Sequence, residues 1–198
     1  MSTRIWLQFA SSISFIKMRP SVEAIVRAAR VCLENGFVPN VEFLLGLPGE
    51  SADEMAATLA LMKRLAEQGA RLALPCVTAR GQSLVFRIFH PSDRLMLGPL
   101  GIPEPSPAAA EVIPDIMLTP LAAFDRLGHR IGYGAGHYDF TFAHLRKAKQ
   151  IIGIGLAFAA QEIEAVPALS HDVALDYVLT ESDVFDFRSS EVAHSLRG

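Results

Sequence analysis

Hydrophobic positions along this chain alternate between a helical spacing and short continuous runs. Apolar side chains lie three and four positions apart in residues 21–36, and the glycine at the end of this stretch predicts the terminus of an amphipathic helix. Residues 41–47 are mostly apolar and are followed by a Pro-Gly turn, which predicts a buried strand. The helical spacing returns in residues 51–69, so a second helix is expected after that strand.

The rest of the chain consists mainly of short apolar runs separated by turns. They predict strands at residues 71–77, 84–88, 115–120, 151–158 and 175–179. Residues 99–114 contain five prolines and predict a wrapped loop, whereas residues 137–150 predict a helix. Uniformly apolar strands that alternate with helices are typical of an α/β sheet covered on both faces. We therefore expect an α/β fold.

Composition and charge restrict the class of protein. A chain of 198 residues that is 51% hydrophobic can bury one good core, so we expect a single domain. A net charge of -3 with scattered Lys and Arg gives no field for attracting nucleic acid. Cys32 and Cys76 lack the spacing of a zinc site, and no apolar run approaches a membrane span. We expect a cytoplasmic monomer without nucleic-acid or membrane partners.

Four glycines stand close together between the strand at 115–120 and the helix at 137–150. They are Gly128, Gly132, Gly134 and Gly136. Backbone amides just before a helix can form a cradle for phosphate oxygens, Arg130 adds a positive charge, and Asp139 could ligate magnesium. The pattern is neither a Walker A loop nor a dinucleotide fingerprint. A tight turn, a helix-capping Asp139 and a solvated Arg130 explain it equally well from spacing alone.

A second acidic position precedes the last predicted strand. Asp172 lies in the run Ser170-His171-Asp172, with Asp176 four residues later. Strand ends in open α/β sheets are where ligands collect, so Asp172 could complete a metal site with Asp139. Taken alone, Asp172 is better explained as a turn residue, with His171 in local hydrogen bonding.

Residues 69–186 together resemble the 5-formyltetrahydrofolate cyclo-ligase family. The likeness is carried, in family order, by GARLALPCV, LVFRIFHP, GPLGIPEP, PDIMLTPLAAFDRLGHRIGYGAGHYD, IGIGLAFAAQEI and VPALSHDVALDYVLTES. The resemblance implies a three-layer α/β/α doubly wound sheet related to ribose-phosphate isomerase and CoA-transferase domains. It also implies ATP-dependent conversion of 5-formyltetrahydrofolate to 5,10-methenyltetrahydrofolate, with release of ADP and phosphate.

The same resemblance implies a set of site residues, with ATP and Mg²⁺ as cofactors. Asp139 and Asp172 match the magnesium ligands, and Arg130 and Tyr133 would act in catalysis. ATP would be bound by Arg130, Ile131, Gly132, Tyr133, Gly134, Ala135, Gly136, His137 and Tyr138. Phe140 stands where the family usually has a basic residue, so one phosphate or folate contact is expected to be absent.

The N-terminal part departs from the family pattern. Residues 1–68 lack the basic helix that reaches ATP phosphates in the family, and residues 1–72 instead resemble a fragment of a radical S-adenosylmethionine enzyme barrel without its cluster cysteines. Residues 69–186 would then form the cyclo-ligase-like core and residues 187–198 a tail. A nucleotide- or folate-binding remnant and a sugar-phosphate isomerase-like enzyme on the same fold are the alternatives.

Overall fold

The structure is a computed structural model that describes most of the chain. The described residues are 38–42, 52–79, 81–132 and 134–188, together with Val26, Ala29, Arg30, Leu33 and Glu34. Those five separate residues are helical, as expected for the helix over 21–36. The remainder of that helix, the part of the strand predicted after residue 42, and the predicted tail from residue 189 lie outside the described residues.

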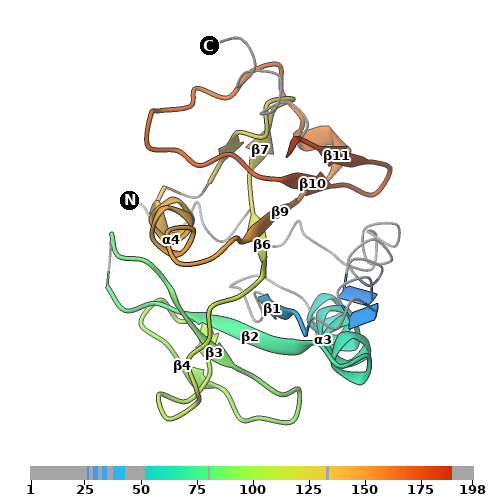
Figure 1. Ribbon diagram of the computed structural model, residues 1–198, viewed down its shortest axis with the longest axis vertical. Coiled ribbons are helices and arrows are strands. Elements are labelled where there is room, and N and C mark those ends of the chain that lie inside the picture. Colours follow the sequence, from blue (N-terminus) through green and yellow to red (C-terminus); the bar gives the residue numbers. More distant parts are fainter. Residues whose placement is uncertain are drawn as a thin grey trace.

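A mixed sheet of seven strands forms the centre of the described structure (Figure 1). In spatial order its strands are β11 (Val184–Asp186), β10 (Tyr177–Leu179), β9 (Ile152–Leu156), β6 (Ile116–Pro120), β1 (Asn40–Glu42), β2 (Arg71–Cys76) and β3 (Val85–Ile88). The inner strands from β10 to β2 pair in parallel, whereas β3 and β11 pair antiparallel at the edges. The strands predicted over 71–77, 84–88, 115–120, 151–158 and 175–179 are confirmed with shorter bounds, and β1 contains the described start of the strand predicted over 41–47.

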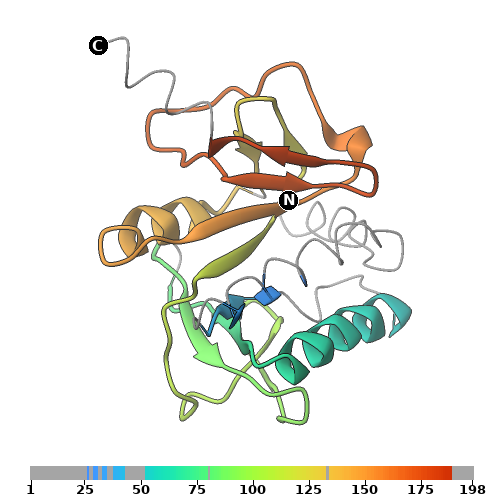
Figure 2. The same ribbon diagram turned by 45° about the vertical axis from the view of Figure 1, so that its right-hand side comes forward.

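Two helices cover opposite faces of this sheet. They are α3 (Ala52–Glu67) and α4 (His137–Leu145). Leu72 and Leu74 of β2 share an apolar cluster with Leu65 of α3, whereas Ala73 between them shares a cluster with Phe142 of α4. Successive side chains of a strand point to opposite faces, so α3 and α4 lie on opposite sides, as Figures 1 and 2 show. The three-layer α/β/α arrangement is confirmed.

The order of the strands places a crevice beside β1. From β1 the chain adds β2 and β3 on one side, and it later returns to β6 on the other side and adds β9 and β10. The direction of the chain across the sheet therefore reverses between β1 and β6. In open α/β sheets, ligands bind outside the carboxyl ends of the strands at such a reversal. A site is therefore expected outside the carboxyl ends of β1 and β6.

Two short hairpins were not predicted from the sequence. β7 (Ala123–Phe124) and β8 (Arg130–Ile131) pair within the glycine-rich segment, and β4 (Met96–Leu97) pairs with β5 (Pro103–Glu104) in the proline-rich loop. Two residues are too few to show the alternation that marks a strand. The segment over 99–114 is therefore a loop with a hairpin at its start.

The end of α4 and the start of the predicted C-terminal tail also differ from the prediction. α4 ends at Leu145 rather than Gln150, because the N–H groups of Ala148 and Lys149 both donate to the Leu145 carbonyl, at 3.0 and 3.1 Å, and tighten the last turn. Phe187 is 8% exposed and belongs to the apolar cluster that contains α4, so the core reaches into the segment assigned to a tail. None of the described helices is long and apolar enough to cross a membrane.

Candidate functional site

A cavity of about 510 Å³ opens close to this reversal, at the carboxyl ends of β6 and of β2, the neighbour of β1. Pro75 and Val77 line it at the end of β2, and Pro120 lines it at the end of β6. The glycine loop, residues 166–172 and the segment from β3 to β5 complete its wall. Small-molecule sites typically have volumes of roughly 300–1,000 Å³, so this cavity can hold a ligand of that size.

The glycine loop runs from β8 to α4 along one wall of the cavity. Gly132, Gly134 and Gly136 line the cavity, as do Ile131, Ala135, His137 and Tyr138. Gly134 and Gly136 have φ angles of 85° and 65°, a left-handed conformation that glycine adopts readily. Gly136 is the N-cap of α4, and the space around Gly132 and Gly134 is open. The loop therefore offers uncovered backbone at a helix N-terminus, an arrangement that binds anions.

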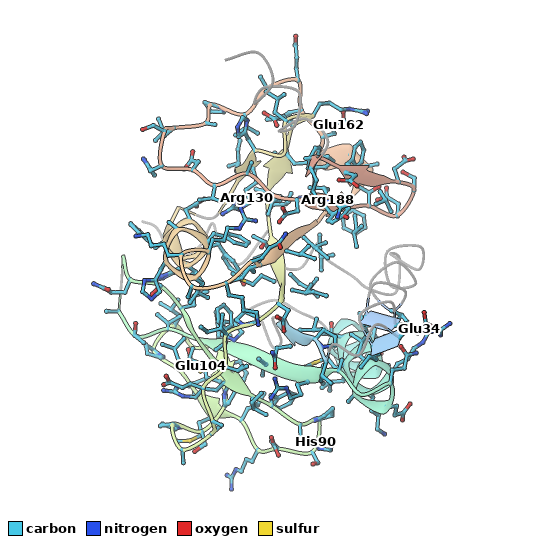
Figure 3. All side chains as sticks on the ribbon, in the orientation of Figure 1. Glu34, His90, Glu104, Arg130, Glu162 and Arg188 are labelled. Carbon is cyan, nitrogen blue, oxygen red and sulfur yellow. The ribbon has the colours of Figure 1, made fainter. Side chains whose placement is uncertain are left out.

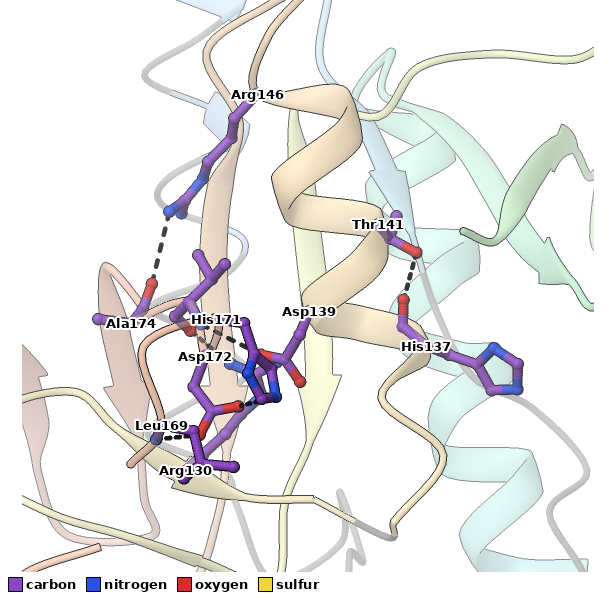
Figure 4. A network of polar contacts seen from close by, with 10 residues as sticks. Arg130, His137, Asp139, Thr141, Arg146, Leu169, His171, Asp172 and Ala174 are labelled. Carbon is purple, nitrogen blue, oxygen red and sulfur yellow. Dashed lines mark hydrogen bonds and ion pairs between the residues drawn. The ribbon is translucent and has the colours of Figure 1, made fainter. Parts of the chain in front are cut away.

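Arg130 lies beside this loop and holds Asp139. The Arg130 side chain is 4% exposed, and its Nη2 donates to Asp139 Oδ1 at 2.8 Å. Its Nη1 donates to the carbonyl oxygen of Val173 at 2.6 Å, and the N–H of Val173 donates to the same Asp139 oxygen at 3.2 Å (Figure 4). The interpretation of Arg130 as a solvated charge is therefore wrong, because its guanidinium is buried and paired.

A second arginine ties the following residues to the other end of α4. Arg146 Nη2 donates to Asp176 Oδ2 at 2.6 Å. Arg146 Nη1 donates to the carbonyl oxygen of Ala174 at 3.4 Å (Figure 4). Asp176 Oδ2 also accepts the N–H of Gly153 in β9 at 2.6 Å. The segment that follows Asp172 is therefore anchored to α4 at two points, by Arg130 and by Arg146.

Asp139 and Asp172 line the same cavity, although they are far apart in the sequence. Asp172 Oδ2 accepts the N–H of Leu169 at 2.8 Å, and Asp172 Oδ1 lies 3.7 Å from Nε2 of the exposed His171. The turn interpretation of Asp172 is thus correct, and it is compatible with a position in the cavity wall. Among the described residues, no hydrogen bond reaches the Oδ2 atom of Asp139.

Asp139 and Asp172 are two carboxylates at the glycine-loop end of the cavity wall that could contribute to a cation site. Within the described ranges, no cluster of three or more His, Cys, Asp or Glu side chains could hold a metal ion alone. Magnesium commonly takes only one or two protein carboxylates and completes its octahedron with water and substrate phosphates. Asp139 and Asp172 supply two carboxylates to the cavity wall.

The remaining predicted residues have different surroundings. Tyr133 lies outside the described residues. His137 Nδ1 lies 3.1 Å from the carbonyl oxygen of Gln82, which connects the glycine loop to the turn before β3. Phe140 is 50% exposed and its ring rests against Gly136 instead of lining the cavity. The position at which a basic residue was expected therefore carries an exposed aromatic ring that packs against Gly136 alone among the described loop glycines.

Asp125, which precedes the glycine-rich segment, is a buried support of the site. It accepts the N–H groups of Leu127, His129 and Val166 at 2.9, 3.0 and 3.0 Å, and Val166 lines the cavity. Burial raises the pKa of Asp125, but the hydrogen bonds from Val166, Leu127 and His129 together outweigh it, so the pKa lies below its ordinary value. Asp125 stays charged and joins the β7–β8 hairpin to the cavity wall.

The part of the cavity wall between β3 and the proline-rich hairpin was not predicted from the sequence. Leu84, Leu100, Ile102 and the buried Glu104 all line the cavity there. The proline content of this segment indicated only a loop. Apolar residues two positions apart beside an acidic residue in that loop, at Leu100 and Ile102, were the available signal.

Known proteins match this chain over most of its length. The model of the 5-formyltetrahydrofolate cyclo-ligase family matches residues 50–181. The 5-formyltetrahydrofolate cyclo-ligase of Escherichia coli K12 is 33% identical over 142 residues, which cover 69% of this chain and 78% of the relative. The enzyme of that name from Haemophilus influenzae is 28% identical over 174 residues, covering 85% and 90%.

A solved structure supports the same relationship at the level of the fold. The 5,10-methenyltetrahydrofolate synthetase of Aquifex aeolicus superposes with a TM-score of 0.64 at 24% identity, covering 94% of this chain and 91% of that one. Matches this long extend into residues 1–68, so the resemblance of residues 1–72 to a radical S-adenosylmethionine barrel is not supported. The chain belongs to the 5-formyltetrahydrofolate cyclo-ligase family.

Proposed function

We propose that this protein catalyses the ATP-dependent conversion of 5-formyltetrahydrofolate to 5,10-methenyltetrahydrofolate, with release of ADP and phosphate. Family membership supports the reaction. The structural observation that carries the proposal is the meeting of Asp139 and Asp172 with the glycine loop in one cavity. Phosphoryl transfer depends mainly on positioning and charge neutralisation, and these are the capacities that such a wall offers.

The charge of the cavity wall supports a requirement for a cation. Of the described residues that line the cavity, Glu104, Asp139 and Asp172 contribute three carboxylates, whereas Arg130 contributes one guanidinium that already pairs with Asp139. These described carboxylates would repel polyphosphate. We therefore propose that Asp139 and Asp172 hold Mg²⁺, which when bound neutralises phosphate charge and orients the transferred group.

In this proposal the loop amides bind phosphate, and Arg130 positions Asp139. The open amides from Gly132 to Gly136 donate to phosphate oxygens. Arg130 and the N–H of Val173 fix Asp139 through its Oδ1 atom, and no described residue hydrogen-bonds to its Oδ2 atom. Arg130 is thus a positioning residue, and the catalytic role expected for Tyr133 stays a prediction.

The chemistry then proceeds in two displacements. The formyl oxygen on N5 attacks the γ-phosphorus, and ADP leaves. N10 attacks the activated formyl carbon, the carbon–oxygen bond breaks, inorganic phosphate departs with that oxygen, and the N10 proton passes to solvent. The apolar wall from Val77 to Ile102 would limit access of water to the activated carbon.

Formation of the methenyl chromophore tests the proposal directly. The full chain is incubated with 5-formyltetrahydrofolate, ATP and Mg²⁺, and absorbance is followed with and without EDTA. Chelator-sensitive, ATP-dependent formation of the chromophore is expected. Stabilisation by the ligands without turnover would instead identify a binding remnant, and turnover of a sugar phosphate without ATP would identify an isomerase. The cytoplasmic location and monomeric state also remain predictions, and light scattering of the purified protein tests the second.

A further inference from the structure

The cavity has two chemically different ends. The end at the glycine loop carries Asp139 and Asp172, whereas the end formed by β2, β3 and β5 is mainly apolar. Figure 3 labels Arg130 near α4 and Glu104 near β3, and these residues mark the two parts of the wall. In the proposed reaction the formyl oxygen must reach the γ-phosphorus, so the spacing of the two ends has to match the bound substrates. Contacts that join the two ends therefore bear on the reaction.

Thr141 in α4 makes such a contact with a single hydroxyl group. The residue is fully buried, and its hydroxyl donates to the carbonyl oxygen of His137 at 2.5 Å (Figure 4). The same oxygen accepts the N–H of Leu84 at 2.9 Å. A hydroxyl has one proton and two acceptor positions, so both hydrogen bonds can form together. Leu84 lines the apolar end of the cavity and His137 lines the glycine-loop end, so Thr141 connects the backbones of both.

Two further contacts hold the same segments together. The Nδ1 atom of His137 lies 3.1 Å from the carbonyl oxygen of Gln82, which is two residues before Leu84. The side chain of Leu84 also shares an apolar cluster with Phe142, the residue after Thr141. The first two turns of α4 are therefore tied to the chain that leads into β3.

We propose that Thr141 is a positioning residue that couples the two ends of the cavity, so that a phosphate ligand on the glycine loop also orders the wall at Leu84. The inference rests on the proposed function. Phosphate bound by the loop amides restrains the N-terminus of α4, and the Thr141 hydroxyl passes that restraint to the Leu84 backbone. A second ligand then meets an ordered wall and loses less conformational entropy on binding. Each ligand should strengthen binding of the other by the same factor.

Calorimetric titration of the full chain measures this coupling without requiring turnover. The titrant is 5-formyltetrahydrofolate, with and without Mg²⁺ and a non-hydrolysable ATP analogue. We expect the analogue to tighten folate binding by at least about fivefold in the unaltered protein, and by less than about twofold in Thr141→Val. This variant keeps the branched shape of the side chain and removes the hydroxyl. Thr141→Ser keeps the hydroxyl and should restore the factor.

Thr180→Val is a matched control for the loss of a buried hydroxyl. Thr180 is buried, its hydroxyl accepts the N–H of Asp183 at 2.9 Å, and the residue does not line the cavity. Each Val variant deprives a backbone N–H of its acceptor, so both should lower Tm by roughly 2–12 °C. Only Thr141→Val should lose the coupling.

A second substitution keeps the test decisive if Thr141→Val does not fold. Thr141→Ala leaves space for a water molecule that can accept the N–H of Leu84 without bonding it to a side chain of α4. This variant should therefore show the same loss of coupling with a smaller loss of stability.

Three results would overturn the assignment. An unchanged factor in Thr141→Val or Thr141→Ala would leave Thr141 with a structural role only. Equal folate affinity with and without the analogue in the unaltered protein would show that the two ends are not coupled. Loss of the factor in Thr180→Val as well would assign the effect to general destabilisation. Turnover decides separately, because coupled binding that depends on Thr141 without a methenyl product contradicts the proposed reaction and not this role.

Discussion

Neutralising Asp139 should separate its structural from its ligand-binding task. In Asp139→Asn, the side-chain oxygen can still accept from Arg130 and Val173, but the charge opposite the buried guanidinium is lost. Breaking a fully buried ion pair costs about 3–5 kcal/mol, and the 24% exposure of Asp139 reduces that cost. Replacing a charge-assisted by a neutral hydrogen bond costs about 1–2 kcal/mol, which corresponds to a lowering of Tm by roughly 2–8 °C at this chain length.

Nucleotide binding should suffer more than stability in this variant. Loss of one of two proposed magnesium ligands should weaken binding of a magnesium–ATP analogue by about tenfold or more. Asp186→Asn provides a matched control, because Asp186 also pairs with an arginine, Arg188 at 2.8 Å, but both side chains are exposed and the pair contributes less than about 1 kcal/mol.

Thermal melting and calorimetric titration on the same samples distinguish the structural role of Asp139 from its role in nucleotide binding. We expect lower Tm and weak nucleotide binding in Asp139→Asn, and near-normal values for both in Asp186→Asn. Normal nucleotide binding with a lowered Tm would refute the metal role and leave Asp139 as an anchor for Arg130. An unchanged Tm would refute the argument that this ion pair stabilises the fold.

Three further predictions follow from the packing of the site. The pKa of folded Asp125 lies below the ordinary 3.8, so the contribution of this carboxylate to folding stability is complete above pH 3.8 and is lost as the pH falls through the folded pKa. Asp125→Asn should therefore lower Tm at pH 6 and flatten the fall of Tm between pH 5 and pH 2. Gly134→Val should abolish binding of a magnesium–ATP analogue, whereas Gly81→Val, at an equally open position with φ 74°, should only cost stability; equal binding losses would contradict the anion cradle. Gly153→Ala would bring Cβ to 2.7 Å from Phe142 Cζ and should destabilise by about 1–3 kcal/mol in urea unfolding, and an unchanged midpoint would show that the ring moves freely.

Local patterns in the sequence were sufficient to predict the strands and the glycine loop that carry the site residues. The continuous apolar runs predicted the inner strands, because a parallel strand covered on both faces must be apolar throughout. The glycine loop before a helix was predicted because left-handed backbone at Gly134 and Gly136 selects glycine. These features depend on neighbours within a few residues. The local sequence is therefore sufficient to predict them.

The chemistry of the cavity was decided by tertiary structure. Spacing alone left Arg130 as either a phosphate-binding or a solvated charge, and the structure shows it buried against Asp139 and Val173. The burial of Glu104 could not be predicted from its proline-rich loop, because it depends on contacts with Val77 after β2 and with Gly98. Strand order, not proximity in the sequence, brings residues from β2, β5, α4 and the loop at Asp172 to one cavity. Such contacts join distant parts of the chain, so they cannot be predicted from periodicity and spacing.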